Sequence, residues 1–214
     1  MFSAFDSVGV IGTGAMGRGI AQIAAQAGSR VKLLDNQPGM ADQARSQVSA
    51  QWAKLAEKGK LSGADASALA DRISVASSLA DLSDCQLVVE AIVENLDIKR
   101  ALMKDLVAIT ATTTVLATNT SSLSITAIAA GSGRESHIVG FHFFNPVPLM
   151  KVVEVIPGLK TQPAVVEQLV SYAKCMGHTP VIAQDTPGFI VNHAGRAYGT
   201  EALRILGERV ADIA

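Results

Sequence analysis

Two side chains that together can transfer a proton lie in the stretch GFHFFNPVPLMKVVEVIPG, residues 140–158. His142 stands among aromatic residues, and Glu154 follows twelve residues later in an apolar run. An imidazole titrates near neutral pH and suits a general base, while a carboxylate on its far nitrogen would fix the tautomer and stabilise the imidazolium. Core packing is the competing interpretation, since a single histidine at the end of a strand is more often structural. However, a glutamate within KVVEVI is not expected to be buried without a partner.

Further polar side chains follow two other expected strands, in VVEAIVEN and LATNTSSLS. They are Glu90, Glu94, Asn119, Ser121 and Ser122. We expect them to face one crevice, because ligands of parallel sheets bind beyond the carboxyl ends of the strands. Helix capping is the alternative for the serines, because Ser122 or Ser124 could begin the short helix ITAIAA. Asn192, in TPGFIVN, is a candidate for orienting a substrate oxygen, although taken alone it would be a helix-surface amide.

The segment GVIGTGAMGRG has the spacing GxGxxG between an expected strand and an expected helix. The first glycine allows a tight turn, the second lets a pyrophosphate approach the backbone, and the third lets helix and strand pack closely. Asp35 ends the next strand roughly 20 residues on, where an acidic residue can bond ribose hydroxyls and would repel a 2′-phosphate. The alternative is a glycine turn with a surface aspartate. The sequence therefore predicts NAD as cofactor, rather than NADP, bound by Gly12, Gly14, Ala15, Met16, Gly17 and Asp35.

The elements that must position these groups alternate between β-branched strands and segments of helical period, which is typical of βαβ units. Strands are expected at 7–12, 30–35, 86–92 and 114–119. A helix between the first two should end at Gly28. A long polar helix over 40–60 carries Lys54, Lys58 and Lys60 near one end, for which a solvated face is the simpler interpretation.

After residue 136, HIVGFHFF and KVVEVI look like successive strands joined by a proline-rich turn, so the sheet is predicted to be mostly parallel. A helix over 163–176 and a strand over 179–184 should follow. Asp185 or Thr186 can then cap a helix that has Pro187 in its first turn. We therefore expect an α/β, Rossmann-type NAD-binding domain over 1–184 that carries the His/Glu pair, and the beginning of an all-helical domain over 185–214.

Composition narrows the classes of partner. The chain has 214 residues, of which 49% are hydrophobic and 17% charged, and a formal net charge of −1. With no run of lysine or arginine, a nucleic acid or an anionic membrane is not expected as the main partner. The N-terminus lacks the features of a signal or transit peptide, and the apolar stretches are too short to span a bilayer. Cys85 and Cys175 form no metal-binding or disulfide pattern, so we expect no metal and a cytoplasmic location.

Five ordered motifs resemble the L-3-hydroxyacyl-CoA dehydrogenase family, which includes 3-hydroxybutyryl-CoA dehydrogenases. They are GVIGTGAMGRGIAQIAAQAG, VVEAIVENLDIK, ATNTSSLSIT, GFHFFNPVPLMKVVEVI and DTPGFIVNHAGRAYGTEAL. The resemblance implies that His142 is the catalytic base and Glu154 its partner, with Ser121 and Asn192 around the 3-oxygen and the nicotinamide. It also implies cofactor contacts from Asp35, Glu94, Lys99 and Asn119, and a contact between Lys58 and the phosphates of coenzyme A.

The resemblance further implies an acyl-CoA substrate in fatty-acid or aromatic-acid catabolism, and a homodimer for a full-length protein. Members of the family continue into a helical C-terminal domain, whereas this sequence stops after about one helix. The chain is therefore expected to be truncated, with an exposed apolar face on its last helix. A non-catalytic or truncated NAD-binding module is the alternative. A hydroxy-acid dehydrogenase that uses a lysine base ranks last, because HFFNP contains no such lysine.

Overall fold

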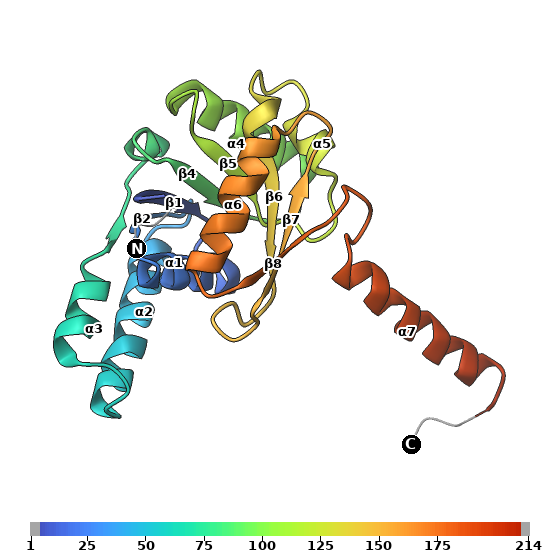
Figure 1. Cartoon of the computed structure of the whole chain (residues 1–214), viewed down its shortest axis with the longest axis horizontal. Coiled ribbons are helices and arrows are strands. Elements are labelled where there is room, and N and C mark those ends of the chain that lie inside the picture. The colour runs from blue at the N-terminus through green and yellow to red at the C-terminus, as the bar shows by residue number, and fades with distance from the viewer. Residues whose placement is uncertain (1–4, 211–214) are drawn as a thin grey trace.

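The computed structural model describes residues 5–210 as one eight-stranded sheet between layers of helices, with a final helix that projects away from the sheet (Figure 1). The strands are β1 (Ser7–Ile11), β2 (Arg30–Leu34), β3 (Ile73–Val75), β4 (Leu87–Glu90), β5 (Val115–Thr118), β6 (Ile138–Phe143), β7 (Val152–Pro157) and β8 (Thr179–Ile182). Their order in the sheet is β3-β2-β1-β4-β5-β6-β7-β8. The first six strands in the chain run parallel to one another, as the alternating pattern predicted.

The helices cover both faces of the sheet. They are α1 (Ala15–Gln26), α2 (Met40–Glu57), α3 (Gly63–Ala70), α4 (Leu96–Ile109), α5 (Ile125–Ala129), α6 (Pro163–Cys175) and α7 (Val191–Gly207), with short 3₁₀ turns at Leu79–Leu82 and Glu135–His137. One hydrophobic core contains side chains of α1, α2 and α6, and a second contains side chains of α4 and α5. Because both faces are covered, β1, β4, β5 and β6 are buried along their whole length. No helix within residues 5–210 combines the length and the apolar character needed to cross a membrane.

Strands β6 and β7 form an antiparallel pair, which confirms the two successive strands expected after residue 136. In this register His142 lies directly opposite Glu154. Residues opposite each other in an antiparallel pair project from the same face of the sheet, so their side chains are neighbours. The chain reversal therefore brings the histidine and the glutamate together.

The start of the last helix differs from its prediction. Helix α7 begins at Val191, not around Pro187, because Gly188 and Phe189 have left-handed φ angles of 81° and 49° that turn the chain sharply. Asp185 instead caps α5, which lies about 60 residues earlier in the chain. Its carboxylate accepts hydrogen bonds from the backbone N–H of Ile125 at 2.8 Å and of Thr126 at 2.9 Å. The sequence contained the correct capping residue type, but its partner is a different helix.

Replacing Asp185 by alanine should lower the free energy of unfolding by about 1–2 kcal/mol at pH 7, because two backbone donors lose their acceptor. Burial alone would raise the pKa of Asp185, but hydrogen bonds from Thr126, Ile125 and Ser124 outweigh it and lower this pKa below 3.8. A carboxylate with a lowered pKa in the folded state stabilises the protein above its unfolded pKa and loses this contribution as the pH falls. Urea unfolding at pH 7 and pH 3 measures both effects, with the exposed Asp105→Ala as control. An equal loss at both pH values would contradict the prediction.

Candidate active site

The histidine and the glutamate predicted to interact form a buried hydrogen-bonded pair. His142 Nδ1 lies 2.7 Å from Glu154 Oε2, and the two residues are 4% and 0% exposed. The rings of Phe144 and Phe189 flank the imidazole, with centroids at 4.6 and 5.6 Å. Within residues 5–210, Nε2 of His142 has no hydrogen-bond partner. A carboxylate on Nδ1 places the proton on that nitrogen and leaves Nε2 free to accept another.

The second oxygen of Glu154 binds the beginning of α7. Oε1 accepts hydrogen bonds from the backbone N–H groups of Ile190 and Val191, each at 2.9 Å. These are donors that a helix start leaves free, and no side chain of α7 itself caps them. Sequence reasoning missed this contact, because backbone donors carry no residue-type signal. One buried carboxylate therefore orients the imidazole and fixes the start of the helix that carries Asn192.

Asn192 and Ser121 are hydrogen-bonded to each other at the edge of a cavity. The side-chain Nδ2 of Asn192 donates to the backbone carbonyl of Ser121 at 3.2 Å, and the backbone N–H of Ser121 donates to Glu94 Oε1 at 2.9 Å. Next to these contacts is an open cavity of about 450 Å³, lined by Ser121, Ser122, Asn192, Gly195 and Arg196. Three of the residues predicted for the crevice therefore lie in one hydrogen-bonded chain.

The prediction that Glu90 faces the crevice is wrong. It is fully buried, and its carboxylate lies 2.5 Å from the ammonium of Lys99, which is itself 1% exposed. The same ammonium lies 3.3 Å from Glu94. Thr118 Oγ1 donates to the other oxygen of Glu90 at 2.7 Å. The Glu90–Lys99 pair is buried because the side chain of Lys99 points inward from α4. The ammonium of Lys99 also attracts the partly exposed carboxylate of Glu94.

Glu94 presents a negative charge to the crevice. Burial raises its pKa, but hydrogen bonds from Thr120 and Ser121 and the nearby charge of Lys99 outweigh it, so the pKa is lowered overall. The carboxylate is therefore ionised at neutral pH and can accept hydrogen bonds from hydroxyl groups. Asp35, at the end of β2, has a similar environment. Burial alone would raise the pKa of Asp35, but hydrogen bonds from Gln37 and Thr13 outweigh this effect, so the pKa is lowered overall.

The three glycines of GxGxxG differ in what surrounds them. Gly12 has a φ of +86°, and a Cβ there would lie 2.6 Å from the carbonyl oxygen of Ala91. A Cβ on Gly17 would clash with the carbonyl oxygen of Gly12. A Cβ on Gly14 would meet nothing within 4 Å, and no side chain caps α1, which begins at Ala15. The helix N-terminus with its exposed residues Gly14 and Ala15 and the half-buried Met16 is therefore open to a phosphate.

The other residues that the sequence singled out for binding or helix capping have different positions in the structure. Asn119 Oδ1 accepts a hydrogen bond from the backbone N–H of Phe143 at 2.9 Å, so this amide joins β5 to the strand of His142. Ser124, not Ser122, caps α5 by accepting from Ala127 N. Lys58 is exposed at the end of α2, a helix that lies near the β3 end of the sheet, whereas α7 lies beyond the β8 end (Figure 1).

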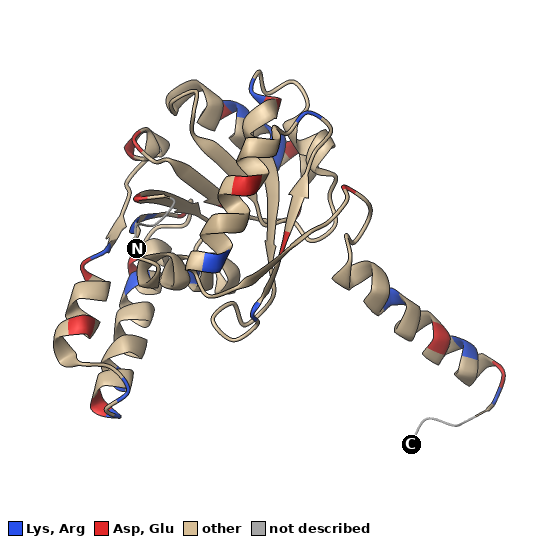
Figure 2. Ribbon diagram, in the orientation of Figure 1, with Lys and Arg blue, Asp and Glu red and all other residues tan. Residues whose placement is uncertain are grey.

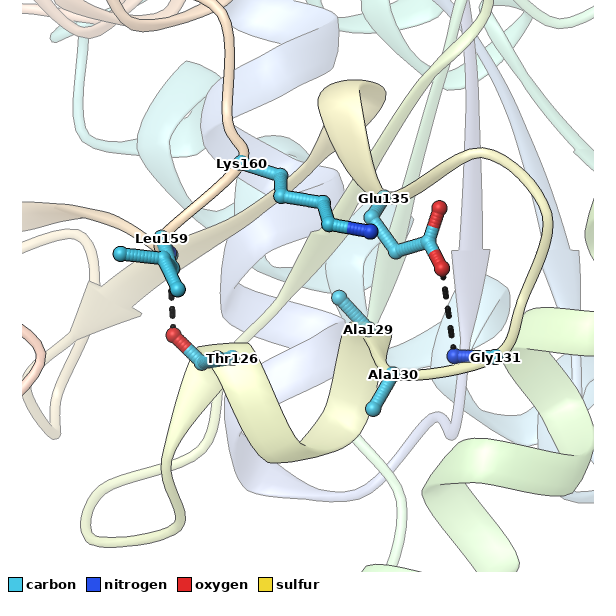
Figure 3. A pocket seen from close by; sticks show the side chains of 8 residues that line it. Thr126, Ala129, Ala130, Gly131, Glu135, Leu159 and Lys160 are labelled. Carbon is cyan, nitrogen blue, oxygen red and sulfur yellow. Dashed lines mark hydrogen bonds between the residues drawn. The ribbon is translucent and has the colours of Figure 1, made fainter.

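A smaller cavity of about 150 Å³ opens at the end of α5, where Lys160 and Glu135 lie at its edge (Figure 3). Its floor is formed by alanines and backbone, and it contains none of the residues predicted to act in catalysis. No group of three or more histidine, cysteine or acidic side chains within the described residues is placed to hold a metal ion. The candidate active site is therefore the cavity at Ser121 and Asn192, which the contacts of Glu154 with His142 and with the start of α7 connect to the imidazole.

Comparison with known proteins identifies the fold and its cofactor. Residues 7–186 match the family model described as the NAD-binding domain of 3-hydroxyacyl-CoA dehydrogenase. The chain belongs to this dehydrogenase family. A probable 3-hydroxybutyryl-CoA dehydrogenase from Deinococcus radiodurans is 44% identical over 204 residues, covering 95% of this chain and 73% of that protein. A 3-hydroxyadipyl-CoA dehydrogenase from Escherichia coli K12 is 42% identical over 206 residues, covering 96% and 43%.

The fold of this family member agrees with solved structures. A crystal structure of 3-hydroxybutyryl-CoA dehydrogenase from Escherichia coli K12 superposes with a TM-score of 0.94 at 42% identity, covering 97% of this chain and 44% of that one. The corresponding enzyme from Ralstonia eutropha gives 0.93 at 36% identity, covering 97% and 74%. In both Escherichia coli matches, the chain thus spans less than half of the matched protein. The predicted α/β fold with an NAD-binding domain is confirmed.

Two glycine substitutions in this family member should distinguish an effect on NADH binding from an effect on the stability of the fold. Gly14→Val should leave the free energy of unfolding nearly unchanged, because its Cβ meets nothing in the protein, but should weaken NADH binding by about tenfold or more by filling the phosphate space. Gly17→Ala should destabilise the fold itself by about 1–3 kcal/mol, because its Cβ clashes with Gly12. Thermal unfolding and NADH fluorescence titration measure the two effects. Equal loss of stability in both variants would contradict the assignment of Gly14.

Proposed function

We propose that this chain carries the NAD-dependent, reversible oxidation of an L-3-hydroxyacyl-CoA to the 3-oxoacyl-CoA. The observation that carries the proposal is the buried His142–Glu154 pair at 2.7 Å, in a family member with an NAD-binding domain and beside a polar cavity. Imidazole on a carboxylate is a general base poised for a hydroxyl proton. NAD, when bound, accepts the hydride that leaves carbon 3 of the substrate.

We assign proton transfer and orientation of the substrate to four side chains. His142 Nε2 removes the 3-hydroxyl proton, and Glu154 holds the imidazole in the tautomer that can do so. The hydroxyl of Ser121 and the amide of Asn192 donate hydrogen bonds to the 3-oxygen and orient it beside the nicotinamide position. In the reverse direction these donors polarise the carbonyl, and the imidazolium returns the proton. The position of Asn192 depends on Glu154, because Glu154 binds the start of α7.

The cofactor would lie along the carboxyl ends of β1, β2, β4 and β5. Its pyrophosphate fits the open helix start at Gly14, Ala15 and Met16, where the turn at Gly12 and the contact at Gly17 set the path of the backbone. Asp35 accepts from the adenosine ribose hydroxyls and disfavours NADP. Glu94 takes the second ribose, with Lys99 holding it in place and Asn119 fixing the adjacent strands.

The acyl-CoA substrate would bind with its phosphates near Lys58, at the basic end of α2. The proposed division places the NAD-binding domain within residues 1–184 and assigns the segment from residue 185 on, which contains α7, to a helical domain. Helix α7 has no buried residue and exposes Tyr198 and Leu203 at 82% and 70%. Such an apolar surface is suited to a contact between two copies in a homodimer.

Steady-state kinetics with acetoacetyl-CoA and NADH test the reaction. We expect oxidation of NADH that saturates with both substrates, and a much lower rate with NADPH, because Asp35 repels a 2′-phosphate. A series of 3-oxoacyl-CoA chain lengths then defines the acyl group. NADH binding without turnover on any acyl-CoA would favour the alternative, a non-catalytic NAD-binding module.

A further inference from the structure

We propose that Arg196 binds a carboxylate at the far end of the acyl chain, so that the site takes a 3-hydroxyacyl-CoA derived from a dicarboxylic acid. The proposal rests on the proposed function, because it places the reacting carbon beside Ser121 and Asn192. Arg196 is the one charged residue among the five that line the 450 Å³ cavity.

The guanidinium of Arg196 is not bonded to any residue in the described range 5–210. Within residues 5–210, no carboxylate forms an ion pair with it, and no hydrogen bond of its side chain is present. Arg204, two turns further along α7, pairs with Glu201 at 2.5 Å and Glu208 at 2.9 Å. Figure 2 shows these alternating charges along the outer part of α7. Arg196 is thus the cation of this helix that remains available to a ligand.

The position of Arg196 follows from Asn192. Residues four apart lie on the same face of a helix, about 6 Å apart along its axis. Asn192 donates to the carbonyl of Ser121, so this face of α7 is turned toward the cavity. Arg196 lies one turn beyond the group that orients the 3-oxygen. In the proposal, the acyl chain extends from the reacting carbon along this face of α7 toward Arg196.

A carboxylate is the anion that suits this position. The planar guanidinium binds carboxylates and phosphates through two parallel hydrogen bonds, so the phosphates of coenzyme A are the other candidate. However, α2, whose basic end at Lys58 is proposed to take those phosphates, lies near the β3 end of the sheet, whereas α7 lies beyond the β8 end (Figure 1). With the phosphates at Lys58 and the 3-oxygen at Asn192, the remaining anion is one at the end of the acyl chain.

The test compares two acyl groups of equal length. Binding of adipyl-CoA and hexanoyl-CoA is measured by calorimetry with the wild-type chain, Arg196→Gln, Arg196→Lys and the control Arg204→Gln. We expect adipyl-CoA to bind about tenfold more tightly than hexanoyl-CoA to the wild type, and the preference to disappear in Arg196→Gln. It should be partly kept in Arg196→Lys, fully kept in Arg204→Gln, and reduced by added salt.

Other results would overturn the proposal. An equal loss of affinity for both ligands in Arg196→Gln would assign Arg196 to the phosphates of coenzyme A, and no loss for either would leave it without a role in binding. Kinetics with 3-oxoadipyl-CoA and 3-oxohexanoyl-CoA give a separate reading. An adipyl preference in binding without NADH oxidation on either substrate would refute the proposed reaction while supporting the carboxylate site.

Discussion

Replacing His142 by glutamine is expected to lower kcat by about 10²- to 10⁴-fold, the usual contribution of a general base. Glutamine keeps the approximate size of the imidazole, but it has no basic nitrogen and cannot accept the hydroxyl proton. Because His142 lies at the end of β6 and not in the glycine turn, the affinity for NADH should remain nearly unchanged. Steady-state kinetics with acetoacetyl-CoA and a fluorescence titration of NADH measure the two quantities.

The matched control is His137→Gln. His137 lies just before β6, and its Nδ1 is 3.0 Å from the hydroxyl of Ser136, outside the candidate site. Its activity should equal that of the wild type. Full activity in the His142 variant, with its fold verified by circular dichroism, would refute the assignment of the base.

Glu154→Gln is expected to lower kcat by about 10²-fold or more while leaving the fold intact. The amide oxygen of glutamine can still accept from Ile190 and Val191, so its NH₂ group must face His142. Nδ1 of the imidazole then becomes an acceptor, and the proton moves to Nε2, which is the nitrogen that has to take the proton from the substrate. The wrong tautomer, not a loss of structure, is the expected cause of inactivity.

Glu154→Ala separates the second role of this carboxylate. Without an acceptor, the N–H groups of Ile190 and Val191 are released, so hydrogen exchange at these two amides should become faster than in the wild type and in Glu154→Gln. Amides of β1, on the other side of the sheet, serve as the internal control. Unchanged exchange at both amides would show that Glu154 does not hold the start of α7.

Much of the fold followed from short-range patterns. The strands at 7–12, 30–35, 86–92 and 114–119 were predicted because buried parallel strands are continuous apolar runs, and such runs need no knowledge of their neighbours. The helix that ends at Gly28 has its left-handed glycine as expected. The short strand β3 and helix α3 were not predicted, because three to eight residues carry too weak a period.

The candidate site divides in the same way. The His142–Glu154 contact was predictable because a single chain reversal joins two adjacent strands, and a buried glutamate requires a partner. The contacts of Glu90 with Lys99 and of Asp185 with α5 could not be predicted, although the sequence marked each of these residues as a candidate for a polar contact. The serine cap of α5 was narrowed to two candidates, and only the geometry decided for Ser124.

The sequence by itself determined the candidate residues for the chemistry, the NAD-binding turn, and the alternation of strands and helices. These depend on residue type and on spacings of a few residues, which local physics controls. Only the tertiary structure decided that Glu154 binds the start of α7, that Asp185 caps α5, and that Arg196 lines the cavity. Such contacts join backbone or side-chain atoms tens of residues apart, and they depend on how whole elements pack against one another.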